Sequence, residues 1–117
     1  MSYSSELSEL IEEFKEIDDK MERLEMVFEL SEEVDFLETE HWNELTRVRG
    51  CQSEAHVVVS IENDLVKLKA GADSKLVQGL MGILTIALRG ISPSEALELT
   101  PDFASEMGVL NSLSPSR

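Results

Sequence analysis

The chain has 117 residues, 42% of them hydrophobic, which is the size and composition of one domain with a single hydrophobic core. Its formal net charge of −14 argues against a nucleic-acid-binding function, because phosphate binding draws on clustered lysine and arginine. No apolar run approaches the roughly 20 residues that a membrane-spanning helix needs, and the N-terminus lacks the basic start and apolar core of a signal peptide.

The acidic residues are concentrated at one end of the chain. Residues 1–44 contain 16 of the 24 acidic residues and three of the ten basic residues, whereas the remainder is nearly neutral. Such a surface either keeps a helical region soluble or steers a charged partner toward the protein. The single cysteine, Cys51, cannot form an internal disulfide, so we expect a reducing compartment, the cytoplasm.

The N-terminal third predicts two helices and an irregular segment. An amphipathic helix is indicated by apolar residues at helical spacing, namely Leu7, Leu10, Ile11, Phe14 and Ile17. The sequence of residues 19–22 predicts a capping box. It would open a second helix with an inward face formed by Met21, Leu24, Val27 and Phe28. Residues 33–47 lose this periodicity, and we expect them to cross the domain irregularly, anchored by Phe36, Leu37 and Trp42.

The middle of the chain predicts an antiparallel hairpin. Residues 55–61 are rich in β-branched side chains and end before Asn63-Asp64, which is a turn signal. Residues 65–70 then alternate, with Lys67 and Lys69 on the face opposite the apolar residues. The hairpin should therefore have one solvated face, and the cysteine loop should lie at the start of its first strand.

A strongly apolar helix is predicted after the hairpin. Asp73 and Ser74 can cap it, Gly90 ends it, and Gly79 and Gly82 suggest close packing of the helix on the sheet. Two short helices follow, the first with capping signals in residues 92–95 and the second between Thr100 and Gly108. The whole chain, residues 1–117, is thus predicted to be one α+β domain, with a small antiparallel sheet of about three strands packed against helices.

Cys51 is the residue with the clearest chemical signal. Gly50 precedes it, Arg47 and Arg49 lie within four residues, and a β-branched run follows. Positive charge stabilises a thiolate, and a loop position leaves the sulfur accessible, whereas structural cysteines usually lie within apolar stretches. The sequence therefore favours a reactive cysteine, with a simple buried cysteine as the alternative.

Most other chemistries lack a sequence signal. Cys51, His41 and His56 do not have the paired spacings of a metal site, so none is expected. A cysteine hydrolase would need His41 or His56 beside the thiol, and nothing in the spacing requires this. No Gly-rich loop precedes a helix to hold phosphate. What remains is sulfur chemistry, in which a thiolate attacks a sulfur–sulfur bond.

Four segments of the chain carry a family resemblance. Residues 48–53 (VRGCQS) closely resemble the cysteine loop of the SufE family of sulfur acceptors in iron–sulfur cluster assembly. Residues 71–80, 91–96 and 113–117 resemble three further blocks of that family, in the same order and with similar spacing. Four ordered blocks are far more specific than one Gly-Cys-Gln-Ser sequence.

The resemblance implies a function in sulfur transfer and an α+β fold shared with the U-type scaffold proteins. In this family, a cysteine desulfurase (SufS-like) that carries pyridoxal phosphate (PLP) holds sulfur as a persulfide. The loop cysteine, here Cys51, would accept that sulfur, stimulate the desulfurase and deliver sulfur to an Fe–S scaffold complex (SufBCD-like). The chain itself would bind neither cofactor nor metal. It would be a relay and activator and not a stand-alone enzyme, or else an acidic docking module that accepts no sulfur.

The resemblance also implies roles for individual residues. Loop shape would depend on Gly50, Gln52 and Ser53, and positive charge near the thiolate on Arg49. Asp73 and Arg117 would hold the loop or contact the desulfurase, although a plain helix cap is an equal alternative for Asp73.

Two features depart from the family pattern. His56 stands where the family usually has a large aromatic residue, so the packing under the loop should differ. The chain also ends at Arg117, where family members continue into a further helix. We therefore expect the C-terminal helix of the family to be missing.

Overall fold

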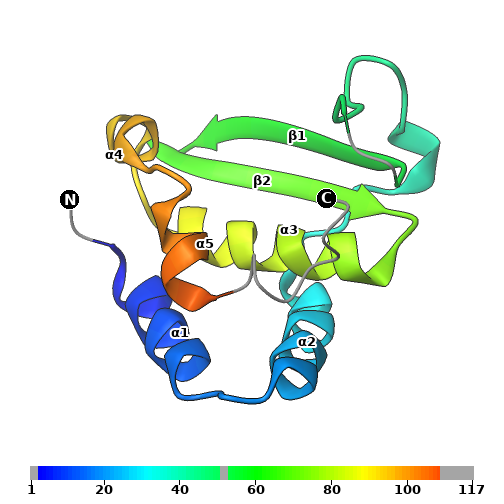
Figure 1. Ribbon diagram of the computed structural model, residues 1–117. Coiled ribbons are helices and arrows are strands. Elements are labelled where there is room, and N and C mark those ends of the chain that lie inside the picture. The colour runs from blue at the N-terminus through cyan, green and yellow to red at the C-terminus, as the bar shows by residue number, and fades with distance from the viewer. Residues whose placement is uncertain (1–2, 51–52, 109–117) are drawn as a thin grey trace.

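The computed structural model describes residues 3–50 and 53–108, which form an α+β fold in layers (Figure 1). An antiparallel hairpin lies on one side of the long helix α3, and two further helices lie on the other side. The elements in chain order are α1 (Ser5–Lys15), α2 (Lys20–Glu29), η1 (Leu30–Glu33), η2 (Thr39–His41), β1 (Ala55–Glu62), β2 (Leu65–Ala72), α3 (Lys75–Leu88), α4 (Pro93–Glu98) and α5 (Asp102–Met107). The predicted fold class is confirmed.

The predicted hairpin is confirmed, although the described sheet has two strands and not three. Asn63 and Asp64 both have left-handed backbones, with φ of 53° and 64°, as a tight two-residue turn between twisted strands requires. Val66, Leu68 and Ala70 are buried toward α3, whereas Lys67 and Lys69 are exposed. The segments beside the sheet contribute only single-residue bridges, Phe36 to Ala70 and Arg47 to His56, which are too short to count as strands.

The first helix forms as predicted as far as Lys15, which leaves Ile17 outside it, whereas the capping box of the second helix does not form. Ser4 caps α1, and Leu7, Leu10, Ile11 and Phe14 are buried beneath it. Asp19 has the extended backbone of an N-cap, but its side chain makes no capping hydrogen bond. A box of Asp19 and Glu22 would bring two carboxylates together, which like-charge repulsion disfavours. Met21 is 63% exposed, so its predicted inward orientation is wrong.

The two glycines of α3 allow a close helix–helix contact, and not the predicted contact with the sheet. A Cβ at Gly79 would lie 2.1 Å from the Val27 carbonyl oxygen, and one at Gly82 would lie 1.9 Å from the Leu30 carbonyl oxygen. Both oxygens belong to the backbone of α2 and η1, which therefore touches the backbone of α3 directly. The sheet is met by another side of α3, where Met81 packs with Ala55 and Ala70.

The core has two parts, one on each side of α3. The larger part joins α1, α2, α3 and α5 around Phe14, Val27, Ile83, Phe103 and Met107. The smaller part fills the space between α3 and the hairpin. The first short C-terminal helix begins with the predicted capping box: Ser92 N–H donates to the Glu95 carboxylate at 2.8 Å, which lowers the pKa of Glu95.

The close contact of α3 with α2 and η1 can be tested with Gly82→Ala. Although alanine favours a helix over glycine by about 1 kcal/mol, its methyl group would overlap a backbone oxygen that cannot rotate away. We expect Gly82→Ala to lower the free energy of unfolding by about 2–3 kcal/mol in urea denaturation. The control is Gln78→Ala in the same helix, which should change it by less than about 1 kcal/mol. A Gly82→Ala protein as stable as the parent would contradict the contact.

Candidate functional site: the base of the cysteine loop

The segments on either side of Cys51 and Gln52, here called the two ends of the cysteine loop, are fixed to each other by backbone hydrogen bonds. Residues 46–48, here called the arm, lie antiparallel to the first residues of β1. Val48 N–H donates to the Ala55 carbonyl at 2.8 Å, and Val57 N–H donates to the Thr46 carbonyl at 2.9 Å. The arm and the start of β1 therefore bring residues 49 and 54 close together, at the end of the hairpin opposite the β1–β2 turn.

A second pair of hydrogen bonds ties the loop to the segment before α3. Glu54 N–H donates to the Asp73 carboxylate at 3.1 Å, and Asp73 N–H donates to the Glu54 carbonyl at 3.0 Å. The N-cap of α3 is Ser74, whose hydroxyl accepts from Val77 N–H at 3.4 Å. The helix-cap alternative for Asp73 is therefore wrong, and its side chain holds the end of the cysteine loop.

His56 lies beneath the loop and is only 2% exposed. Its Nε2 lies 2.9 Å from a Glu54 carboxylate oxygen, and its Nδ1 lies 2.6 Å from the Thr46 hydroxyl. Since a carboxylate only accepts hydrogen bonds, Nε2 carries a proton. The Trp42 ring stacks on the imidazole at 4.7 Å between centroids and an interplanar angle of 17°.

Two further contacts connect this arrangement to its surroundings. Trp42 Nε1 donates to the Leu37 carbonyl at 2.9 Å, within the crossing segment, and Leu37 N–H donates to the Ala70 carbonyl of β2 at 2.9 Å, which fixes that segment to the sheet. Arg47 lies 4.0 Å from the same Glu54 oxygen that His56 approaches. The imidazole thus joins the arm, the end of the loop and the crossing segment, three segments that the hairpin alone would not hold together.

The structure places some of the predicted site residues and not others. Gly50 has φ of 81°, a left-handed backbone that favours glycine, and it is exposed, as is Arg49. Ser53 is partly buried, and Asp73 contacts the loop end as described. Cys51, Gln52 and Arg117 lie outside the described residues.

The contacts of His56 bear on the hydrolase alternative. Both of its ring nitrogens lie within hydrogen-bond distance of other side chains, Glu54 and Thr46, so neither is free to act as a base. The other histidine, His41, is exposed in η2.

Glu54, Thr46 and Trp42 are the residues at this site that the sequence did not predict. A signal for Glu54 was present, because residues two apart in a strand share a face, and Glu54 precedes His56 by two. The contacts with Thr46 and Trp42 are made across 10 and 14 positions of sequence, and no local pattern indicates them.

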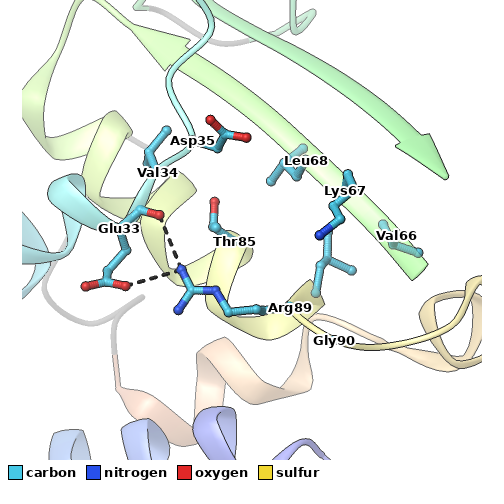
Figure 2. Close-up of a pocket in the computed structure, with 10 residues that line it drawn as sticks. Glu33, Val34, Asp35, Val66, Lys67, Leu68, Thr85, Arg89 and Gly90 are labelled. Carbon is cyan, nitrogen blue, oxygen red and sulfur yellow. Dashed lines mark hydrogen bonds and ion pairs between the residues drawn. The ribbon is translucent and has the colours of Figure 1, made fainter. Parts of the chain in front are cut away.

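A cavity of about 190 Å³ lies elsewhere, beside the first half of β2 (Figure 2). Its lining includes Asp35, Lys67, Thr85 and Arg89, and the Arg89 guanidinium lies 3.2 Å from the Glu33 carboxylate. The base of the cysteine loop is at the other end of β2. Its one hydroxyl group, that of Thr85, donates to the Met81 carbonyl at 2.8 Å.

Within residues 3–50 and 53–108, no three His, Cys, Asp or Glu residues are arranged to hold a metal ion. None of the helices there is long and apolar enough to cross a membrane.

A hairpin backed by a long helix, with the two segments that flank the cysteine tied together at its end, defines a small α+β protein. Residues 8–117 match the SufE family, described as an Fe–S metabolism associated domain. The chain belongs to the SufE family, and its role lies in Fe–S metabolism.

Individual relatives agree with this assignment. The chain is 32% identical over 111 residues to an uncharacterised SufE-like protein of Synechocystis, covering 95% of this chain and 70% of that protein. It is 30% identical to SufE-like protein 1, chloroplastic/mitochondrial, of Arabidopsis thaliana, and covers only 30% of that longer protein. The solution structure of a hypothetical protein from Thermus thermophilus matches with a TM-score of 0.79 at 26% identity, covering 97% of this chain and 83% of that one.

The role of the buried imidazole can be tested by comparing the two histidines. His56→Ala removes a stacked ring and leaves the Thr46 and Glu54 side chains without their buried partner. We expect the free energy of unfolding to fall by about 2–4 kcal/mol. His41→Ala, at an exposed position, should change it by less than about 0.5 kcal/mol. Equal effects of the two substitutions in urea denaturation would contradict the role assigned to His56.

Proposed function

We propose that this protein accepts sulfur on Cys51 from the persulfide of a PLP-dependent cysteine desulfurase. It thereby stimulates the desulfurase and carries the sulfur toward Fe–S cluster assembly. The observation that carries the proposal is the base of the loop, where Asp73, Glu54 and the arm close both ends of a short segment around the only cysteine. The membership of the chain in a family associated with Fe–S metabolism supports the same reading.

The transfer is a thiol exchange that balances without an oxidant or a cofactor on this chain. The Cys51 thiolate attacks the outer sulfur of the desulfurase persulfide and forms a new sulfur–sulfur bond. The old sulfur–sulfur bond breaks, and the desulfurase cysteine leaves as a thiolate. The outer sulfur moves from one cysteine to the other, and no electrons are gained or lost overall.

The described residues support this step by limiting how far the loop can move. A loop anchored at both ends loses less conformational freedom on docking than a free segment, so less of the binding free energy is consumed in ordering it. Gly50, with its left-handed backbone and no atoms within 4 Å of an added Cβ, gives the chain a sharp bend without crowding. The exposed Arg49 adds positive charge next to the thiolate in sequence.

The proposed carrier role of Cys51 also constrains the redox state of the compartment in which the protein works. Between transfers Cys51 must remain a free thiol, because oxidation to a disulfide or a sulfenic acid would remove the nucleophile. The protein therefore requires a reducing compartment, which we propose is the cytoplasm.

A second candidate function is an acidic docking module that binds a desulfurase without accepting sulfur. The observation in its favour is the acidic surface, because most carboxylates of residues 5–33 are exposed on α1, α2 and η1. A charged surface of this kind accelerates encounter with an oppositely charged partner. The two functions make opposite predictions for Cys51→Ser.

The deciding measurement is desulfurase turnover in the presence of each variant. Cys51→Ser removes the nucleophile, so we expect it to lose the stimulation of desulfurase turnover, while circular dichroism shows an unchanged fold. The control is Ser105→Ala, an exposed change in α5 that should stimulate like the parent chain. Full stimulation by Cys51→Ser would contradict sulfur acceptance and support the docking module.

A further inference from the structure

Within the described part of the chain, the outer edge of β1 is open over its second half. The N–H of Val57 and the carbonyl of Ala55 point away from β2, because both bond to the arm. Along a strand these groups alternate, so those of Val59 and Ile61 point the same way. Among the described residues they have no backbone partner. The arm leaves this edge at Thr46, whose N–H turns to Asn43. In Figure 1 only β2 lies alongside this half of β1.

The side chains of this edge do not protect it from pairing. Val59 and Ile61 are 60% and 61% exposed, and Val58 is 38% exposed. Natural edge strands are usually blocked by lysine, proline or a bulge, and residues 57–61 contain neither lysine nor proline and pair regularly with β2. An edge with these properties is suited to adding a further strand.

We propose that the strand it adds is β1 of a second copy of this chain, antiparallel, with the two-fold axis at Ser60. In this register Val59 of each copy lies opposite Ile61 of the other, so all four open N–H and carbonyl pairs are satisfied. If the register were shifted toward the start of β1, the second copy would have to bond to the N–H of Val57, which already donates to Thr46. If the register were shifted toward the end of β1, the second copy would have to pair with Asn63, which lies in the turn and has a left-handed backbone.

The side chains in this register are complementary on both faces of the joined sheet. On the side facing α3, Val59 lies beside Ile61 of the other copy. Within each copy, Val59 pairs with Leu68 and Ile61 pairs with Val66, so the apolar side chains form a continuous row across all four strands. On the outer face, Glu62 lies opposite Val58 of the other copy, whose own partner is Lys69. Glu62 and the second copy's Lys69 are then two strand spacings apart, about 10 Å, within reach of two long side chains.

The distribution of charge also favours the edge of β1 as the interface between two copies. Two chains of net charge −14 repel each other, and most of that charge lies in residues 1–44. The hairpin, residues 55–72, contains two acidic residues (Glu62, Asp64) and two basic ones (Lys67, Lys69), so it is neutral. Since α1 and α2 lie on the opposite side of α3 from the hairpin (Figure 1), the edge of β1 is a place where two copies can meet without opposing acidic surfaces.

Cross-linking tests the register directly. In the proposed register, Ser60 of one copy faces Ser60 of the other as a non-hydrogen-bonded pair. The Cα atoms of such a pair lie about 4.5 Å apart, within the range that a disulfide needs. We expect Ser60→Cys, in a Cys51→Ser background, to form a covalent dimer under oxidised glutathione. The matched control is Ser105→Cys in the same background, exposed on α5, which should remain monomeric. Equal cross-linking of both, or of neither, would overturn the proposal.

Sedimentation equilibrium of the otherwise unmodified chain tests the same surface without cross-linking. We expect concentration-dependent self-association that Ile61→Lys weakens about tenfold or more, because lysine blocks an edge strand. Leu97→Lys, at an 89% exposed position in α4, should leave it unchanged. A monomer at all concentrations overturns the proposal. So does loss of desulfurase stimulation by Ile61→Lys without any change in self-association, which would assign the edge to the desulfurase. Since both variants in the cross-linking experiment lack Cys51, its result does not depend on sulfur transfer.

Discussion

The burial of one imidazole organises the functional end of this protein. A buried polar ring must find hydrogen-bond partners or lose a large part of its solvation free energy, and His56 finds them in Thr46 and Glu54. These residues belong to the arm and to the end of the cysteine loop, and the stacked Trp42 belongs to the crossing segment. The requirement of a single side chain therefore fixes three irregular segments around the start of β1. Asp73 extends the arrangement to α3 by holding the Glu54 backbone.

The two ends of the hairpin have different environments. At one end, the arm uses the outward backbone groups of Ala55 and Val57, and the crossing segment stacks its Trp42 on His56. At the other end, no backbone group of the described residues pairs with this edge at Val59 and Ile61. The acidic helices lie on the far side of α3. A sulfur-bearing loop, a self-pairing edge and an acidic surface can thus occupy separate parts of one small domain without competing for the same residues.

Much of the fold could be predicted from the sequence, because its signals are local. The hairpin turn at Asn63-Asp64, the apolar face of α1 and the capping box at Ser92 each depend on residues a few positions apart. The errors arise where the partner is distant. Gly79 and Gly82 indicated a close contact of α3, but the sequence did not show that the backbone of Val27 and Leu30 would be the contacting segment. Cys51 was singled out by its sequence neighbours, whereas the network around His56 joins residues from 42 to 73, which no local pattern connects.

The central claim is that sulfur passes through Cys51. It is tested most directly by mass spectrometry of the parent chain after incubation with a cysteine desulfurase, pyridoxal phosphate and free cysteine. The account predicts a gain of about 32 Da, the mass of one sulfur atom, on the peptide that contains Cys51, and its removal by a thiol reductant. An unmodified Cys51 peptide, recovered while the desulfurase is demonstrably turning over, would contradict it.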